Sequence, residues 1–275
     1  MNRLDTERRA LVIKALVDGN SLRATARISG VARMTVEKLL RDVALACHEY
    51  HDAHVRNLKS RRIQCDEIWS FIGAKERQIQ KNPTIKQRNP DAGDAWTWTA
   101  LDADSKLVIS YAVGGRTARE AHELLQDVAS RVSTRVQLTT DGFTQYLHAV
   151  EDHVPDADYG TLSKIYKDVG HKGRYSPPVC IGCVAKAVYG TPDPKHISTS
   201  YVERSNLTMR MSMRRFTRLT NAFSKKLEMH FAAVALHFFY YNFCRIHETL
   251  RVTPAMAAGI AVVALEIEDI INLIN

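Results

Sequence analysis

Three acidic residues, far apart in the chain, occur in sequence contexts in which a carboxylate can take part in chemistry. Asp66 lies within a stretch that has the composition of a β-strand, and Asp141 ends another such stretch just before a glycine. Glu203 is near the start of a long segment without glycine or proline. Carboxylates that a fold gathers at one point repel one another unless a cation lies between them. Because hard oxygen ligands suit Mg²⁺ or Mn²⁺, we expect a site for two such ions.

Two metal ions about 3.5–4 Å apart can activate the attacking oxygen and stabilise the leaving oxygen of a phosphodiester. Such a site needs no protein nucleophile, because water attacks in the first step and the freed 3′-hydroxyl attacks in the second. We therefore predict that Asp66, Asp141 and Glu203 are the catalytic and metal-binding residues. Glu67 adjoins Asp66, but alternation along a strand directs it to the opposite face. For each acid taken alone, a solvated or salt-bridged carboxylate is the alternative.

The segment that contains Glu203 also carries polar and basic side chains at helical spacing. Asn206, Arg210 and Arg214 follow Glu203 by three, seven and eleven positions, which places them on one face of a helix. A helix that starts with an acid and continues with basic residues can hold a metal ion and then contact backbone phosphates. We assign these three residues and Arg204 to DNA contact. A solvated charged face is the alternative.

Residues 6–46 have the pattern of three short helices. Ser21 can cap the second helix, and Gly30 permits a tight turn into the third, as in a helix-turn-helix. An ordinary three-helix bundle is the alternative. The DNA-reading edge of the third helix is predicted to include Arg33, Thr35, Lys38 and Arg41, with Glu37 between them.

The middle of the chain changes to the period and composition of strands that alternate with helices. Strands are predicted at 62–72, 96–102, 107–113 and 136–140, and helices at 117–132 and 145–153. This order matches a ribonuclease-H-like core, in which the first and fourth strands are parallel neighbours. The predicted fold class is α/β: a ribonuclease-H-like mixed five-stranded sheet with flanking helices, plus a small all-α amino-terminal helix-turn-helix domain.

Four regions are predicted along the chain. They are a helix-turn-helix DNA-binding domain (1–46), a helical linker (47–61), a catalytic domain (62–260) with a basic insertion at about 160–197, and a carboxyl-terminal helical tail (261–275). Within the linker, His48, His51 and His54 are expected to face solvent. Between 198 and 253, two long helices should meet near residues 220–221. The insertion is expected to be a strand followed by irregular basic chain that includes Lys164, Lys167, His171, Lys172 and Arg174.

The formal charge of +8 and the pI near 9.3 favour a polyanionic partner such as nucleic acid. No apolar stretch is long enough to span a bilayer, and the amino terminus is charged instead of carrying an apolar signal segment. The five cysteines are an odd set with irregular spacing, which argues against a disulfide framework. We therefore expect no membrane partner and a location in a reducing compartment such as the cytoplasm.

Cys180 and Cys183 form a C-x-x-C pair that could hold zinc together with His171 or His196. A closed zinc site needs four ligands, and the sequence offers no second pair of cysteines. We therefore favour reduced cysteines in a loop over a zinc site.

Several segments of this chain resemble the bacterial insertion-sequence transposases of the IS1 type. They are Asp66-Glu67-Ile68-Trp69, Thr140-Asp141-Gly142, Tyr201-Val202-Glu203-Arg204-Ser205-Asn206, and the tail from Tyr241 to His247 that continues through Leu250 to Thr253-Pro254-Ala255. The resemblance covers nearly all of residues 60–260. It implies a DDE transposase whose metal-binding triad is Asp66, Asp141 and Glu203, with Asn206 and Arg210 as downstream polar partners.

The same resemblance implies binding to the terminal inverted repeats of an insertion sequence, transfer of 3′-hydroxyl ends into target DNA, and work as a homo-oligomer on paired ends. One rival hypothesis is a non-catalytic DNA-binding regulator that keeps the core as a dimerisation scaffold. Three carboxylates in these positions argue against it. A second rival is a ribonuclease-H-like or junction-resolving nuclease without integration, against which the predicted amino-terminal DNA reader argues.

Overall fold

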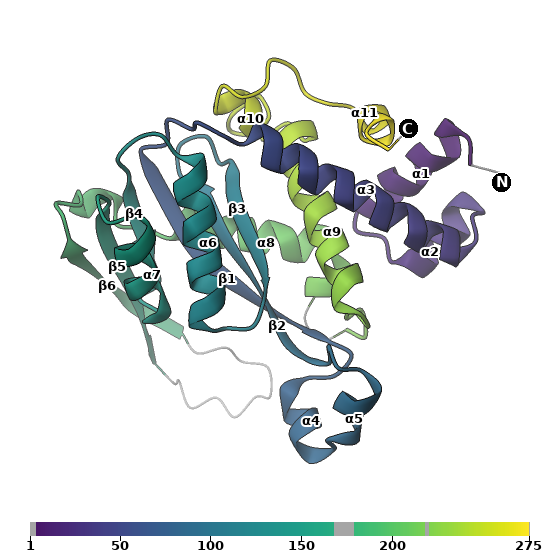
Figure 1. Cartoon of the computed structure of the whole chain (residues 1–275), viewed down its shortest axis with the longest axis horizontal. Helices are drawn as coiled ribbons and strands as arrows, with labels where there is room; N and C mark the ends of the chain where they lie inside the picture. Colours follow the sequence, from purple (N-terminus) through teal and green to yellow (C-terminus); the bar gives the residue numbers. More distant parts are fainter. Residues whose placement is uncertain (1–3, 168–178, 218–219, 275) are drawn as a thin grey trace.

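A six-stranded mixed sheet in the order β3-β2-β1-β4-β5-β6 lies at the centre of the protein in the computed structural model (Figure 1). The structure describes residues 4–167, 179–217 and 220–274. Neighbouring strands are antiparallel except that β1, β4 and β5 run parallel to one another. The strands are β1 (Arg62–Ile72), β2 (Gly93–Asp102), β3 (Val108–Gly114), β4 (Gln137–Thr140), β5 (Asp158–Lys167) and β6 (Val179–Tyr189).

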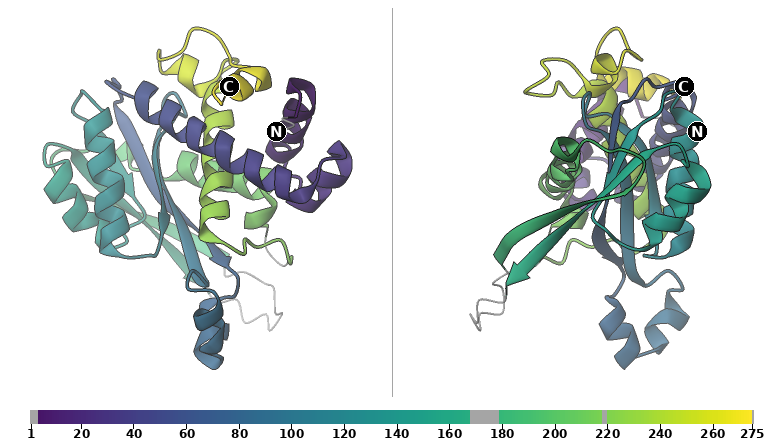
Figure 2. Two further views of the ribbon diagram at one scale, coloured as in Figure 1. Left: turned by 45° about the vertical axis from the view of Figure 1, so that its right-hand side comes forward. Right: turned by 90° about the vertical axis from the view of Figure 1, so that its left-hand side faces the viewer.

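The α/β class and the first four predicted strands are confirmed, but the sheet has six strands where five were expected. The additional strand is β6, which occupies part of the predicted irregular insertion and pairs with β5 along almost its whole length. Figure 2 shows this β5–β6 hairpin projecting away from the rest of the sheet. Its outer part is solvated on both faces, with Ile181 and Val184 more than half exposed. His171, Lys172 and Arg174 of the predicted insertion lie outside the described residues.

Helices cover both faces of the sheet. On one face lie α6 (Ala118–Arg131) and α7 (Gln145–His153), and on the other lie α8 (Ser200–Ser212) and α9 (Leu227–Phe239) (Figures 1 and 2). The apolar residues of α6 recur at helical spacing, with Leu124, Leu125 and Val128 all buried. Opposite them, Val202 and Met209 of α8 pack with residues of β1, β3 and α9.

The amino-terminal residues form α1 (Thr6–Val17), α2 (Leu22–Ser29) and α3 (Arg33–His54). The Ser21 hydroxyl caps α2, as predicted, and Gly30 takes the left-handed conformation (φ 66°) that turns the chain into α3. α3 continues far beyond the predicted boundary at residue 46 and crosses α9 (Figure 2). Residues 47–54 of the predicted linker are therefore the last turns of a long helix.

The prediction that the three histidines of this segment face solvent is wrong for His51. Its side chain is buried, and its Nε2 lies 3.1 Å from the carbonyl oxygen of Val108 in β3. His48 is half-buried with its Nδ1 3.1 Å from the hydroxyl of Tyr111, and His54 is exposed. The reason is that α3 lies against the sheet and α9, so part of its polar face becomes an interior surface.

The two helices predicted between 198 and 253 are present but shorter than expected. α8 ends at Ser212 and α9 begins at Leu227, and the 3₁₀ turn η2 (Arg214–Phe216) lies in the connection between them. Of the described residues, none belongs to a helix with the length and apolar character needed to cross a membrane. The remaining elements are α4 (Glu76–Lys81), α5 (Thr84–Arg88), the 3₁₀ turn η1 (Pro194–His196), the π-helical turn η3 (Tyr240–Cys244), α10 (Pro254–Ala257) and α11 (Ile267–Asn272).

Candidate active site

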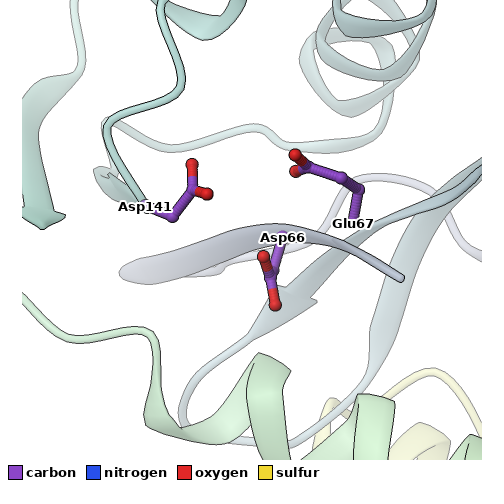
Figure 3. Close-up of side chains that lie close together, drawn as sticks. All are labelled: Asp66, Glu67 and Asp141. Carbon is purple, nitrogen blue, oxygen red and sulfur yellow. The ribbon is translucent and has the colours of Figure 1, made fainter. Parts of the chain in front are cut away.

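Three carboxylates meet where β1 and β4 lie side by side (Figure 3). One oxygen each from Asp66, Glu67 and Asp141 lies within 4.8 Å of the other two. The strand register explains why: Gln64 of β1 pairs with Thr139 of the parallel strand β4, so Asp66 and Asp141 each follow two residues later along neighbouring strands. Asp141 directly follows the last residue of β4, and its carboxylate is turned to the side on which Glu67 lies, where Arg116 is 3.9 Å away (Figure 3).

Asp66 and Glu67 leave β1 in opposite directions, as strand alternation predicts (Figure 3). Glu67 is directed to the side of α7, where both of its oxygens accept hydrogen bonds: Oε1 from Arg116 Nε at 2.7 Å and Oε2 from the Tyr146 hydroxyl at 3.2 Å. Asp66 is directed to the side of α8, where its Oδ2 accepts a hydrogen bond from Asn206 Nδ2 at 2.8 Å. Glu67 therefore belongs to the cluster, but its oxygens are already satisfied by protein donors.

Asp141 begins the turn that follows β4. Its Oδ1 accepts a hydrogen bond from the backbone N–H of Phe143 at 2.9 Å, and its side chain is 36% exposed. Gly142 has a φ of 86°, and a Cβ there would lie 2.8 Å from the hydroxyl of Ser163. Only glycine fits this turn without strain. The turn holds one Asp141 oxygen and leaves the other near Arg116 Nη2, at 3.9 Å.

The electrostatics of the cluster favour uptake of a positive charge. Burial raises the pKa of Asp66 to about 7, and the charges of Glu67 and Asp141 act in the same direction. Burial also raises the pKa of Glu67, as does the charge of Asp141, while Arg116 opposes the shift. Close carboxylates in a partly desolvated site bind either a proton or a cation.

Glu203 lies outside this group of three, although its charge contributes to the raised pKa of Asp66. Its carboxylate accepts hydrogen bonds from the Thr199 hydroxyl and from Lys164 of β5. The first turn of α8 is fixed to β1, because Gln64 Oε1 accepts hydrogen bonds from the backbone N–H groups of Tyr201 and Val202 at 2.9 and 3.1 Å. The structure thus brings Asp66 and Asp141 together, and it holds Glu203 near them in an ion pair with a lysine.

The donor set fits a hard divalent cation. It consists of carboxylate oxygens from Asp66 and Asp141, with the amide of Asn206 alongside. The Asn206 Oδ1 atom is buried and has no hydrogen-bond partner among the described residues. A buried amide oxygen without a donor is uncommon in proteins, and a water of a metal's hydration shell would satisfy it. Of the described residues, Asp66, Glu67 and Asp141 are the one group arranged to hold a metal ion.

Comparison with known proteins supports the resemblance seen in the sequence. No protein-family profile matches the chain. The chain is 25% identical over 171 residues to the insertion element iso-IS1n protein InsB of Shigella dysenteriae, a match that covers 61% of this chain and 86% of that protein. The chain is therefore similar to a protein of an insertion element of the IS1 type. The predicted resemblance is thereby confirmed.

The predicted DNA-reading residues of α3 are at the surface and partly engaged in ion pairs. Arg33 lies 3.3 Å from Glu37, and Lys38 lies 3.0 Å from Asp42. Arg41 extends to Glu228 at the start of α9, at 3.4 Å. Thr35 is half-buried. The beginning of α3 is therefore accessible to a partner, whereas Arg41 forms an ion pair with Glu228 of α9.

The predicted basic stripe of α8 is divided by the structure. Asn206 is buried in the acidic site, Arg210 is half-buried, and Arg204 is exposed. Arg214 is exposed but belongs to η2, because α8 has already ended. Arg214 and Arg33 line the same cavity of about 750 Å³, between the amino-terminal helices and the α8–α9 connection. The other basic residues that line this cavity are Arg23, Arg215, Lys225 and Lys226.

Four residues of the candidate site were not identified from the sequence: Gln64, Glu67, Arg116 and Lys164. Gln64 carried a usable signal, because it is a polar residue two positions before Asp66 in an apolar strand and therefore shares its face. Arg116 and Lys164 had no such signal, since their roles depend on contacts between distant segments. Cys180 and Cys183 lie exposed on β6, and Cys183 pairs with Lys164 in the strand register.

Proposed function

We propose that this protein is a DNA transposase of the DDE type, built on a ribonuclease-H-like core, which cleaves the ends of an insertion sequence and joins them to target DNA. The family relationship supports a role in transposition. The observation that carries the catalytic part is the register of β1 and β4, which brings Asp66 and Asp141 within 4.8 Å of each other beside the helix that bears Glu203.

Asp66, Asp141 and Glu203 are the proposed ligands of Mg²⁺ or Mn²⁺, bound as two ions. When bound, such ions activate the attacking oxygen and stabilise the leaving one. The residues of this chain hold and orient that site. Asn206 fixes one oxygen of Asp66, and Gln64 fixes the start of α8. Lys164 forms an ion pair with Glu203, and it would be available to a phosphate if Glu203 held a metal ion instead.

DNA binding is assigned to the helix-turn-helix arrangement of α2 and α3 and to the basic cavity behind it. Arg33 and Lys38 lie at the start of α3, and Arg214 faces the same cavity as Arg33 from the other side. Six basic side chains and one acidic side chain, Glu37, line this cavity, which suits a phosphodiester backbone. We propose double-stranded DNA as the partner, both the terminal inverted repeats and the target, bound by a homo-oligomer on paired ends.

Isosteric substitutions at the carboxylates test this function. Asp66→Asn, Asp141→Asn and Glu203→Gln should each abolish Mg²⁺-dependent cleavage and strand transfer on a terminal-repeat substrate, with DNA binding retained in a gel-shift assay. Glu67→Gln is the matched control, because Glu67 is satisfied by Arg116 and Tyr146 and should remain partly active. Full activity of one triad variant would remove that residue from the site. A wild-type protein that binds the repeats but never cuts them would instead be a DNA-binding regulator.

A further inference from the structure

A row of half-exposed aromatic side chains begins beside the acidic cluster and runs along β1 and β2. Trp69 and Phe71 follow Glu67 on the same face of β1, and Trp96 of β2 is paired directly with Trp69. Phe223 continues the row, with its ring 4.8 Å from that of Phe71. We call these four residues, Trp69, Phe71, Trp96 and Phe223, the aromatic platform.

The aromatic platform lies on the part of this sheet face that the helices no longer cover. Two residues before Trp69 on β1, Glu67 is paired with Trp98 of β2. The Trp98 side chain is fully buried, and its ring centroid lies 5.3 Å from that of Tyr146 in α7. Beyond that point β1 and β2 extend past α6 toward α4 and α5 (Figure 1). On the other face of β1 the alternating residues Ile68, Ser70 and Ile72 are all buried. The rings of the aromatic platform therefore remain half-exposed, because the layer of α6 and α7 ends before them. The opposite face of β1 is packed against the rest of the protein.

Two cations lie over the rings. The guanidinium carbon of Arg116 is 4.7 Å from the Trp96 ring centroid, and the ammonium of Lys75 is 5.3 and 5.6 Å from those of Trp69 and Phe71. Arg116 also contacts Glu67 at 2.7 Å and approaches Asp141 at 3.9 Å, so one side chain joins the platform to the carboxylates. Two residues along a strand correspond to about 7 Å, which places Trp69 within a nucleotide or so of the cluster.

We propose that the aromatic platform stacks unpaired bases of the DNA strand next to the scissile phosphate. The inference rests on the proposed function and adds that the DNA is locally single-stranded there. Rings offer stacking surfaces to bases, and Lys75 and Arg116 offer charge to the adjoining phosphates, the combination used by proteins that bind single strands. A paired duplex hides the faces of its bases, so only bases released from the duplex can use this surface.

The tryptophans make this surface directly observable. The chain has three, Trp69, Trp96 and Trp98, and all lie on this face of β1 and β2. A short oligothymidylate, added without divalent metal and with a chelator present, should quench their emission. The same oligomer built from abasic units, which keeps the phosphates and lacks the bases, should not. Because no metal and no cleavage are involved, failure of this test is distinct from failure of the proposed catalysis.

Substitutions separate stacking from apolar packing. Trp69→Leu and Phe71→Leu should each weaken binding of the oligothymidylate by about tenfold, the lower range for loss of one base–ring stack, and leave duplex binding unchanged. Trp69→Phe, which keeps a ring, should bind nearly as the wild type does. Circular dichroism and thermal unfolding establish that each variant is folded, and Asp66→Asn should retain the quenching.

Three results would overturn the proposal. The first is equal quenching by the abasic oligomer. The second is equal loss of duplex and single-strand binding in folded Leu variants. The third is tryptophan emission that changes with protein concentration in the absence of DNA, which would assign the platform to contact between two copies of the chain.

Discussion

At the scale of single residues, the candidate site is defined by what each carboxylate contacts. Glu67 and Asp66 are adjacent in sequence, but Glu67 is held by an arginine and a tyrosine, whereas Asp66 accepts one hydrogen bond from an amide. Glu203 is paired with Lys164. The carboxyl of Asp66, whose pKa is raised to about 7, is therefore the one to which a metal ion would add most.

The raised pKa of Asp66 gives the first prediction. Because that pKa is about 7, the carboxyl of the metal-free protein is protonated at lower pH, and a metal ion must displace the proton. Affinity for Mn²⁺, measured by electron paramagnetic resonance without DNA, should be constant above about pH 7 and fall below it by up to about tenfold per pH unit. Asp66→Asn should bind more weakly and lose this pH dependence. Equal affinity at about pH 8 and about pH 6 would contradict the assignment.

At the scale of elements, β1 organises the site because it contacts each part of it. It pairs with β4 to align the two aspartates, and through Gln64 it fixes the first turn of α8. The buried amide oxygen of Gln64 satisfies two N–H groups at the start of the helix, groups that have no partner within the helix itself. The position of Glu203 thus depends on a residue that is not among the proposed metal ligands.

Gln64→Ala should therefore reduce both stability and cleavage. Loss of two buried hydrogen bonds should lower the free energy of unfolding by about 1–3 kcal/mol in urea denaturation. The rate of cleavage should fall by more than the folded fraction does, because α8 is no longer fixed to β1. Gln137→Ala is the matched control: its side chain also makes two hydrogen bonds, with the backbone of Asp193, but far from the carboxylates. Equal loss of cleavage in the two folded variants would show that the position of Gln64 has no special importance.

The elements also show which parts of the fold the sequence could predict. The strands 62–72, 107–113 and 136–140 were found nearly to the residue, because buried β-branched and aromatic residues mark them. β6 was missed because its side chains are solvated on both faces and so lack an inside–outside alternation. α8 and α9 were expected to be longer because no glycine or proline separates them, but the burial of Phe216 and Ser224 fixes their connection in another conformation.

The candidate site was likewise predictable from the sequence only in part. Asp66 and Asp141 were recognisable from local context, because each follows from the position of its own strand. Two other contacts depend on segments that are distant in sequence. They are the ion pair of Glu203 with Lys164 and the position of Arg116 near both Glu67 and Asp141. Contacts of this kind have no local pattern to reveal them.

At the scale of the whole molecule, the amino-terminal helices are integrated with the rest of the protein. α3 packs along α9, and α1 contacts α11 near the carboxyl terminus, where Lys14 lies 3.4 Å from Glu268. The interior between these layers contains neutral histidines. Burial lowers the pKa of His51 and His237 to about 4 and that of His230 to about 3.

Stability should therefore fall on mild acidification. Between the unfolded pKa of about 6.5 and the lowered folded values, the unfolded chain binds protons that the folded chain does not, so each histidine removes up to about 1.4 kcal/mol per pH unit. Asp66 acts in the opposite sense over about pH 4 to 7, because its pKa is raised in the folded state. The pKa of Glu67 is also raised in the folded state, so this carboxyl acts in the same sense as Asp66. Three histidines against these two carboxyls leave a net loss of stability.

The measurement is urea denaturation at several pH values between about 7.5 and 5, in the Asp66→Asn background to remove one of the opposing carboxyls. Replacing the exposed His148 by Gln should leave the pH dependence unchanged, whereas His230→Gln should reduce it. A midpoint that does not move with pH would show that these histidines titrate alike in the folded and unfolded chains.

The length of α3 sets a fixed span across the protein. Its first turn carries Arg33 and its last turns bury His51 against the central sheet, eighteen residues later, which is about 27 Å of unbroken helix. The carboxyl-terminal end of this helix is anchored against β3, which is separated from β1 by β2 in the central sheet. Under the proposed function, the DNA read at the start of α3 and the phosphodiester cut at the carboxylates should therefore lie a constant distance apart along the duplex.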